Sequence, residues 1–526
     1  MRRAAVVATI VAVSSAVPAI RDQAADARVR MPSDFNGDGY ADLAIGTPEE
    51  DIAGVQGVGA VNVLYGRATG LSAAGDQLWY ESVVGIPEVN GAGDMFGFAL
   101  TPGDFDGDGF GDLAVGQPFA DVGGIMNAGQ VVVLHGSALG LTATRSQLWT
   151  QDTEGVPDEA EVRDQFGYSL TSGDFDGDGF ADLAIGVQRE SAGAWNSGAV
   201  EVLYGGVDGL VAGRTQFWVQ GASGVADAAE RKDQFGNALG VGDFDGDGRS
   251  DLAVGTERED VGETADAGSV TVLRGTAGGL TGEGSQLWTQ TAVADGLSEA
   301  GDGFGRALAT GDLDGDLVDD LAVSVPLEDL AAPNVGVVDV LYGSSSGLSA
   351  NGSQEWSQAT DDVPGEPDSY DQFGKAVAIG DLDGDGYSDL AAGVRYDDPG
   401  GVKDAGVVNV LYGTSAGLGA GHAQLWKQDM PDVPDPVESP DHFGSCLAAA
   451  DFGKNASDDI VIGTHFETLG DKTYAGSLHV LYGSPDGVRA SGSQFWSQDS
   501  PGVRELSDGW DYFPAAFGVA GSGRCG

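Results

Sequence analysis

The sequence predicts an all-β fold, a seven-bladed β-propeller of four-stranded blades whose ring is closed by the C-terminal strand. Three observations predict it. One acidic motif recurs seven times, successive copies begin 69 or 70 residues apart, and each unit contains four short segments with strand-like patterns. A supersecondary unit repeated at constant spacing indicates one array rather than separate domains. Four strands per repeat are typical of propeller blades.

The unit around residues 166–218 shows the four predicted strands. The first carries a Phe-Gly pair at 166–170, and the acidic loop follows it. A short apolar strand comes next at 183–186, and a third strand at 200–204 alternates apolar and polar residues, which is the period of a strand. The fourth carries Gln-x-Trp at 216–218. No segment shows helical periodicity, so we expect almost no helix.

The two ends of the array are complementary. The acidic loop at Asp34 has no Phe-Gly strand before it, whereas residues 511–517 (DYFPAAF) align with 441–447 (DHFGSCL) but lack a following acidic loop. We therefore expect residues 511–519 to pair beside the strand near 42–46, which would leave no open seam in the ring. The predicted organisation is a single propeller over residues 28–526, with blades at 34–80 plus 511–519, 94–150, 164–219, 233–289, 302–357, 371–427 and 441–497.

The charge balance excludes some partners. Acidic residues outnumber basic ones 82 to 25, giving a formal net charge of -57. Such a polyanion repels nucleic acid and anionic membranes, so we expect neither as a partner. The hydrophobic content of 41% is sufficient for a large core.

The first residues have the pattern of a signal peptide. Arg2 and Arg3 precede an apolar stretch at 4–20, and small residues at 17–19 or 25–27 could end it as a cleavage site. We expect a signal peptide at 1–27 and a secreted, extracellular protein. The alternative is an N-terminal membrane anchor, although the stretch is short for one and contains Pro18. No later segment has an apolar run long enough to span a membrane. Whether Cys446 and Cys525 form a disulfide is left open, as is the oligomeric state.

The recurring loop has the ligand spacing of a calcium site. In Asp-x-Asp/Asn-x-Asp-Gly-x-x-Asp, side-chain oxygens stand at positions 1, 3, 5 and 9, the carbonyl at position 7 adds another, and glycine at 6 permits a sharp turn. No Glu stands at position 12, so Asp at position 9 is the expected closing ligand. The alternative is an acidic turn chosen for turn chemistry. Clustered carboxylates would repel one another without a cation, which favours Ca²⁺.

The predicted ligands occupy the same five positions in six loops. They are Asp34, Asn36, Asp38, Tyr40, Asp42; Asp104, Asp106, Asp108, Phe110, Asp112; Asp174, Asp176, Asp178, Phe180, Asp182; Asp243, Asp245, Asp247, Arg249, Asp251; Asp312, Asp314, Asp316, Val318, Asp320; and Asp381, Asp383, Asp385, Tyr387, Asp389. Five loops keep the full pattern and are expected to be strong sites. In the Asp312 loop Leu317 replaces the glycine, so that site is expected to be weaker. The Asp451 loop has Gly453 and Asn455 in place of acids and is expected to be empty.

The combination of a Phe-Gly pair, a DxDxDG loop and a Leu-Ala-Val-Gly strand resembles the FG-GAP repeat of integrin α-subunit propellers. Related repeats occur in secreted bacterial proteins and in some fungal lectins. The resemblance covers nearly the whole chain after about residue 33. It implies a seven-bladed propeller with structural calcium on one face and ligand binding on the other. It does not imply an integrin, and it identifies no β-subunit.

The loops opposite the acidic motifs differ between repeats, which is typical of binding loops on a fixed scaffold. Trp195, Tyr396, His465 and Phe466 are the candidate ligand-binding residues there. The tryptophans of the Gln-x-Trp segments recur regularly, which favours packing between blades over sugar stacking; they are Trp79, Trp149, Trp218, Trp288, Trp356, Trp426 and Trp496.

We expect a binding protein rather than an enzyme. Residues 343–347 and 413–417 both match Gly-x-Ser-x-Gly, but both stand where other repeats have a hairpin turn, whereas a nucleophile elbow joins a strand to a helix. The leading hypothesis is an extracellular adhesion or recognition module with a protein or glycan ligand. The alternatives are a lectin-like carbohydrate binder and, third, a secreted hydrolase.

Overall fold

The computed structural model describes residues 31–83, 91–293, 297–453, 455–504 and 509–519. The predicted signal peptide at 1–27 lies outside them. The chain from Met31 onward forms one compact unit. Its regular secondary structure consists of strands, as the sequence predicts, with α1 (Gln290–Val293) and the 3-10 turn η1 (Pro399–Gly401) as short exceptions.

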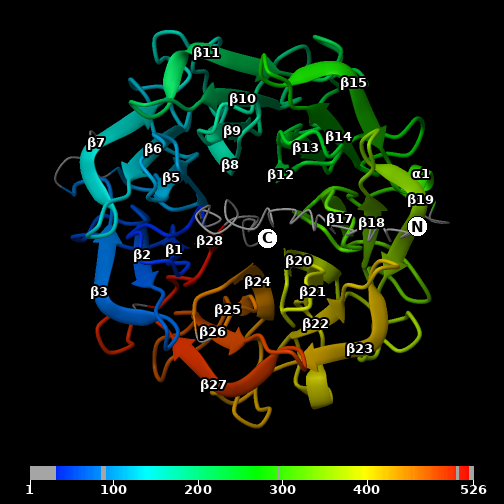
Figure 1. Cartoon of the computed structure of the whole chain (residues 1–526). Coiled ribbons are helices and arrows are strands. Elements are labelled where there is room, and N and C mark those ends of the chain that lie inside the picture. The colour runs from blue at the N-terminus through cyan, green and yellow to red at the C-terminus, as the bar shows by residue number, and fades with distance from the viewer. Residues whose placement is uncertain (1–30, 84–90, 294–296, 454, 505–508, 520–526) are drawn as a thin grey trace, which may run out of the picture. The chain divides into compact units, whose positions relative to one another are not determined.

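The strands form seven four-stranded antiparallel sheets arranged in a ring (Figure 1). The predicted seven-bladed β-propeller is confirmed. Blade 1 has the order β28-β1-β2-β3, and blades 2 to 7 each contain four consecutive strands, from β4–β7 to β24–β27.

The second, third and outermost strands have similar lengths in the seven blades, whereas the innermost strands range from three to eight residues. The innermost strands are β28 (Ala516–Gly518), β4 (Ala99–Gly103), β8 (Phe166–Gly173), β12 (Ala238–Gly242), β16 (Leu308–Gly311), β20 (Phe373–Gly380) and β24 (Phe443–Ala450). The second strands are β1 (Leu43–Thr47), β5 (Asp112–Gln117), β9 (Asp182–Val187), β13 (Asp251–Thr256), β17 (Asp320–Val325), β21 (Asp389–Val394) and β25 (Asp459–Thr464). The third strands are β2 (Ala60–Tyr65), β6 (Gln130–His135), β10 (Ala199–Tyr204), β14 (Ser269–Arg274), β18 (Val337–Tyr342), β22 (Val407–Tyr412) and β26 (Ser477–Tyr482). The outermost strands are β3 (Ser72–Trp79), β7 (Thr142–Trp149), β11 (Val211–Trp218), β15 (Thr281–Trp288), β19 (Ser349–Trp356), β23 (Gly419–Trp426) and β27 (Arg489–Trp496).

The C-terminal strand closes the ring. β28 pairs antiparallel with β1, with Ala516 opposite Gly46 and Gly518 opposite Ala44. Phe513 and Phe517 are buried in one cluster with Leu43, between blades 7 and 1. The last strand of the chain therefore supplies the inner strand of the first blade, as predicted.

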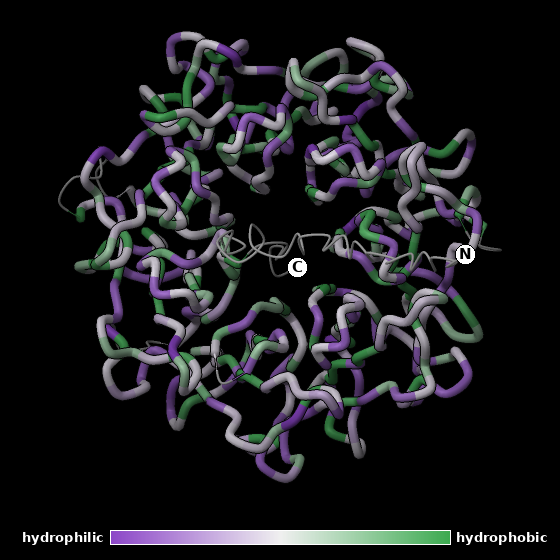
Figure 2. Tube along the Cα trace, in the orientation of Figure 1, coloured by the Kyte–Doolittle hydropathy of each residue, from purple (hydrophilic) through white to green (hydrophobic). Residues whose placement is uncertain are grey.

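The core lies between the blades. The second strands are buried along their whole length, whereas the outermost strands expose their middle residues. One cluster joins Val61 and Val63 of blade 1 to Val132 and Leu134 of blade 2, and equivalent clusters occupy the other junctions. Figure 2 shows the same division, with hydrophobic colouring within the blades and hydrophilic colouring in many peripheral loops.

The Phe-Gly pair makes the closest contact between neighbouring blades. Phe166 is fully buried, and Gly167 has a φ of 86°, which strains any other residue. A Cβ at Gly116 in blade 2 would lie only 2.3 Å from the Gly167 carbonyl oxygen, so both positions require glycine. The predicted inner strand includes this pair in blades 3, 6 and 7. In blades 2, 4 and 5 the strand begins after it. The glycine has a positive φ in all six blades, and where the strand includes the pair its register shifts there, as between Phe166 and Ser169.

The Gln-x-Trp segments bridge adjacent blades, as the sequence predicts. Gln216 of blade 3 accepts a hydrogen bond from the Tyr204 hydroxyl (2.5 Å) and donates from Nε2 to the Leu280 carbonyl of blade 4 (3.0 Å). The Leu280 N–H donates in turn to the Tyr204 hydroxyl (2.9 Å). Trp218 is buried in the cluster between these blades. The segments 343–347 and 413–417 lie in the turns between third and outermost strands, also as predicted.

Candidate functional site

In blades 2 to 7 the acidic loop connects the innermost strand to the second strand, and in blade 1 it directly precedes β1. In the Asp174 loop, carboxylate oxygens of Asp174, Asp176 and Asp178 lie within 4.8 Å of one another, and the same holds for Asp104, Asp106 and Asp108. The Asp174 carboxylate accepts hydrogen bonds from the N–H groups of Gly177 (2.8 Å) and Gly179 (2.9 Å), which fold the loop around it. Positions 1, 3 and 5 thus converge in a small all-oxygen cluster.

The position-9 aspartate also has a structural role. Asp182 accepts a hydrogen bond from Phe175 N–H at the start of its loop (2.9 Å) and another from Gly205 N–H in the turn after the third strand (2.9 Å). Burial raises the pKa of Asp182 to about 8, although these two hydrogen bonds act in the opposite direction. The same pair of contacts is made by Asp42, Asp112, Asp251, Asp320, Asp389 and Asp459.

The donor set fits a hard divalent cation. Three to four carboxylates within one loop give the oxygen ligands that calcium prefers, with no nitrogen or sulfur ligand among the predicted positions. A carboxylate oxygen that accepts one backbone N–H retains a second lone pair for a metal ion. The hydrogen bonds of Asp182 are therefore compatible with its predicted role as closing ligand.

Basic side chains approach the position-3 aspartates of three loops, which the sequence analysis missed. Arg145 pairs with Asp106, Arg214 with Asp176 and Arg274 with Asp245. These arginines come from the third or outermost strands, about 30 to 40 residues along the chain from their partners. Partial neutralisation by arginine distinguishes the loops of blades 2, 3 and 4 from the others.

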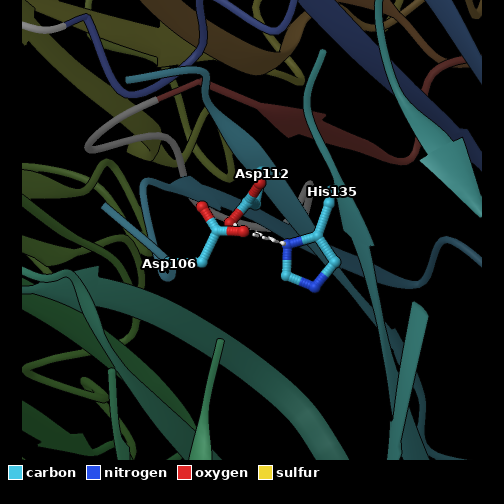
Figure 3. Close-up of side chains that lie close together, drawn as sticks. All are labelled: Asp106, Asp112 and His135. Atoms are coloured by element: carbon cyan, nitrogen blue, oxygen red, sulfur yellow. Dashed lines mark ion pairs between the residues drawn. The ribbon is translucent and has the colours of Figure 1, made fainter. Parts of the chain in front are cut away.

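Blade 2 also places a histidine at its loop (Figure 3). His135 Nδ1 lies 3.2 Å from Asp112 and 3.5 Å from Asp106. Burial lowers the pKa of His135, but the hydrogen bond and charge of Asp112 outweigh burial, and the pKa is raised. The other blades have tyrosine or, in blade 4, Arg274 at this position.

Two loops depart from the common acidic pattern, those that begin at Asp312 and Asp451. Leu317 adopts a φ of 71° and leaves its side chain 88% exposed, so the residue is held in the left-handed region that glycine occupies in the other loops. In the loop of blade 7, Asn455 Nδ2 donates to the Gly483 carbonyl (2.7 Å). The Asn455 side chain therefore holds the loop against the turn after the third strand of the same blade.

The loops between second and third strands lie at the opposite ends of the blades, because neighbouring strands run antiparallel. Three of the four predicted ligand residues come together there. Tyr396 of blade 6 and His465 and Phe466 of blade 7 belong to one group of contacting rings, here called the aromatic cluster, whose members are Tyr396, His442, His465, Phe466, Tyr474, Trp510 and Tyr512.

The aromatic cluster continues from blade 7 into the segment that leads to β28 of blade 1. The rings of His465 and Tyr512 stack at 4.9 Å, and Tyr474 lies 4.7 Å from Phe466 and 4.7 Å from Trp510. Trp510 is 57% exposed, and its backbone N–H donates to the Thr473 carbonyl oxygen (2.9 Å). An exposed indole therefore stands at the edge of a supported aromatic surface.

A partly buried arginine supports the cluster from blade 6. Arg395 donates from Nε to His442 Nδ1 (3.1 Å), and its guanidinium lies 5.3 Å from the Tyr396 ring and 5.6 Å from the Phe466 ring. Burial, followed by the charge of Arg395, lowers the pKa of His442 to about 3, and burial lowers the pKa of His465 to about 4. Both imidazoles are neutral at physiological pH.

A pocket adjoins this surface, lined in part by Tyr370, Tyr396 and Lys403. Trp195, the fourth predicted ligand residue, lies in blade 3 and is 52% exposed. Its ring contacts Arg231 at 4.6 Å and Lys232 at 6.0 Å rather than the aromatic cluster. Sequence reasoning missed His442, Tyr474, Trp510 and Tyr512; the available signal was the gathering of aromatic residues in loops that are small or polar in other repeats.

Fold and loops together define a class: a closed seven-bladed propeller with repeated acidic loops on one face. Six segments match the FG-GAP repeat family, at residues 31–64, 96–134, 166–203, 235–273, 304–341 and 373–411. The chain therefore contains six FG-GAP repeats and forms an integrin-like β-propeller. The unit of the Asp451 loop is not among the matched segments.

Curated relatives support this assignment. The chain is 33% identical over 258 residues to integrin alpha-PS2 of Drosophila melanogaster, covering 47% of this chain and 16% of that protein. It is 35% identical over 167 residues to integrin alpha-7 of Mus musculus, covering 30% and 12%. It is 31% identical over 179 residues to phosphatidylinositol-glycan-specific phospholipase D of Rattus norvegicus, covering 34% and 20%. The chain thus spans a fifth or less of the length of each of these relatives.

Among solved structures, an exotype rhamnogalacturonan lyase (YesX) aligns with a TM-score of 0.37 and 13% identity, over 85% of this chain and 69% of that one. That likeness is too low to indicate an activity. Within the described part of the chain, no helix is both long and apolar enough to cross a membrane. Cys446 is buried and disulfide-bonded, whereas Cys525 lies outside the described residues.

Proposed function

We propose that this protein is a secreted, calcium-binding propeller that acts as an extracellular adhesion or recognition module. The integrin-like FG-GAP propeller is consistent with recognition. The observation that carries the proposal is the aromatic cluster, which joins blades 6, 7 and 1 on the face opposite the acidic loops. Rigid aromatic side chains supply contact area at low cost in conformational entropy and are enriched in binding surfaces.

Calcium is assigned a supporting role on the other face. The loops that begin at Asp34, Asp104, Asp174, Asp243 and Asp381 hold the ions most strongly, and the Asp312 loop holds one more weakly. Bound cations neutralise carboxylates that otherwise repel one another, so they stiffen the connection between the first and second strands of each blade. The aromatic face is then presented on a rigid ring.

The ligand is an extracellular protein or a glycan. Exposed Trp510 beside Tyr474 favours a lectin-like activity as the second candidate, because aromatic rings can stack on the apolar faces of sugars. A secreted hydrolase is the third candidate, in view of the similarity to a phospholipase D.

The experiment is binding of the purified mature chain to an array of glycans and extracellular-matrix proteins, in calcium and in chelator. A defined hit that requires calcium supports the proposal and gives the class of ligand. Absence of any hit from a folded, calcium-loaded protein, or turnover of an arrayed substrate, contradicts it.

A further inference from the structure

A second set of acidic groups lies at the blade junctions, on the face opposite the FG-GAP loops. At each of these junctions a buried glutamine that follows the Gln-x-Trp strand donates to a carboxylate of the next blade. Gln151 Nε2 lies 3.0 Å from Glu190, and Gln290 Nε2 lies 2.6 Å from Glu328. The other amide atom, Oε1, is buried without a hydrogen-bond partner in both glutamines. At each of the two junctions, the glutamine therefore has a buried Oε1 that accepts no hydrogen bond.

The junction between blades 2 and 3 gathers further carboxylates around this glutamine. Oxygens of Glu161, Asp164 and Glu190 lie within 4.8 Å of one another. Asp164 accepts a hydrogen bond from Glu161 N–H (2.5 Å), which fixes these two residues together. Glu161 is exposed and Asp164 is buried, so the group extends from solvent into the interior.

Glu201 adds a fully buried carboxylate from β10. Its exposure is 0%, and neither side-chain oxygen has a hydrogen-bond partner. It lies directly across from Ile185, which packs in the hydrophobic cluster between blades 2 and 3. Burial, followed by the charges of Asp158 and Glu190, raises the pKa of Glu201 to about 8. An unpaired carboxylate in this position is costly unless a positive charge or a proton compensates it.

The junction between blades 4 and 5 repeats the arrangement. Asp339 occupies the position of Glu201 on β18, is 0% exposed, and has no partner for either carboxylate oxygen. Burial, followed by the charges of Glu355 and Glu328, raises the pKa of Asp339 well above its usual range. Glu328 accepts the hydrogen bond from Gln290 Nε2. Asp302 accepts a hydrogen bond from Glu299 N–H (2.5 Å), as Asp164 does from Glu161.

We propose that these two junctions are divalent-cation sites distinct from the FG-GAP loops, the first held by Glu161, Asp164, Glu190, Glu201 and Gln151 Oε1, the second by their counterparts around Asp339. The donor set is all oxygen and strongly anionic, which favours calcium over zinc or copper. A cation there satisfies the unpartnered oxygens and joins adjacent blades. The inference stands apart from the proposed recognition function and from the calcium loops.

The other junctions provide an internal control. Thr271 replaces Glu201 between blades 3 and 4, although Glu230, Asp233 and Glu259 keep the outer carboxylates. His479 replaces it between blades 6 and 7, and its Nε2–H donates to the Pro434 carbonyl oxygen (2.9 Å). These two junctions have no carboxylate at the position of Glu201, so no cation is assigned to them.

The test counts bound calcium per chain by mass spectrometry after equilibration and gel filtration. Glu201→Gln is expected to lose one equivalent relative to wild type, and Glu201→Gln with Asp339→Asn is expected to lose two. Thr271→Val should leave the count unchanged. Asp178→Asn, in an FG-GAP loop, reports separately on the loop ions. An unchanged count in the folded double variant overturns the proposal.

Thermal melting separates a cation from a proton at Glu201. If a cation is bound, Glu201→Gln melts lower than wild type in calcium but no lower in chelator, where it removes an unpaired charge. If the carboxyl is simply protonated, glutamine mimics it and the two proteins melt alike in calcium. The second pattern contradicts the proposal.

Discussion

At the scale of single residues, Asp182 shows how one side chain serves both the fold and an ion site. Each of its oxygens accepts a backbone N–H, one from Phe175 and one from Gly205. The Asp178 carboxylate, in contrast, accepts a hydrogen bond from the N–H of Phe180 in its own loop (3.1 Å), which an asparagine side-chain oxygen could retain. The two positions therefore make separable contributions.

We expect Asp182→Asn to destabilise the protein in calcium and in chelator alike, because the amide leaves one buried N–H without an acceptor at a cost of about 1–3 kcal/mol. Asp178→Asn should melt like wild type in chelator and lose part of the increase produced by calcium. Denaturation of both variants under the two conditions checks this. Equal behaviour of the two variants in chelator would contradict the structural role of Asp182.

The neutral histidines of the aromatic cluster predict a pH dependence. The pKa of His465 is about 4 in the fold, below its ordinary value of 6.5, because the ring is buried. As pH falls from about 6.5 to about 4, the unfolded chain binds the proton first, so this residue lowers the stability of the fold by about 1.4 kcal/mol per pH unit in that window. Its effect is absent above that range.

Unfolding of wild type and His465→Gln at several pH values measures this effect by difference, which cancels the titration of the many carboxylates. Wild type should lose stability relative to the variant between pH 6.5 and 4. Parallel curves for the two proteins over that window would contradict the lowered pKa, because they would show that His465 titrates alike in the folded and unfolded chain.

At the scale of elements, the closing strand β28 is only three residues long, but it completes the sheet of blade 1. Phe517 is 1% exposed and packs in the cluster that joins blade 1 to blade 7. Without this strand, β1 would be an open edge able to pair with other chains.

We predict that Phe517→Ala costs about 3–5 kcal/mol, as expected for removing a buried phenylalanine, and increases self-association. Trp510→Ala, nearby in sequence but exposed, should leave the melting temperature nearly unchanged. Melting and sedimentation measure both. A Phe517→Ala protein as stable and monodisperse as wild type would argue against closure by β28.

The sequence predicts elements well here because each strand is specified several times by one repeating pattern. The Phe-Gly pair, the acidic loop and Gln-x-Trp recur at fixed spacing, so ring closure follows from what the two ends lack. Contacts between side chains that are distant along the chain are harder to predict from the sequence. Arg214 reaches Asp176, and Gln151 reaches Glu190, only because antiparallel strands and adjacent blades bring them together.

The aromatic cluster illustrates the same limit. Tyr396, His465 and Phe466 were identifiable because they interrupt the repeat pattern. Their association with Tyr474 and Trp510 depends on blades 6, 7 and 1 meeting around the closure of the ring, which spacing along the chain does not reveal.

At the scale of the whole molecule, charge and calcium are coupled. A formal charge of -57 favours any state in which cations neutralise clustered carboxylates. An ion that binds only the folded protein stabilises it by about 2.7 kcal/mol per site when its concentration is 100 times the dissociation constant.

Calcium should therefore raise the melting temperature, and chelator should lower it. The increase in melting temperature that calcium produces should become smaller in each of the variants Asp34→Asn, Asp104→Asn and Asp381→Asn. Magnesium at the same concentration serves as the comparison ion. Identical melts in calcium and in chelator would refute the structural role assigned to the loops.

The most direct test of the account compares wild type with Tyr474→Ala/Trp510→Ala for binding to the same array of glycans and matrix proteins in calcium. Trp195→Ala is the matched control, since it removes an exposed indole outside the aromatic cluster. The account predicts a defined ligand that the double variant loses and the control retains, with both variants folded. Retention of that ligand by the double variant would contradict recognition through this face.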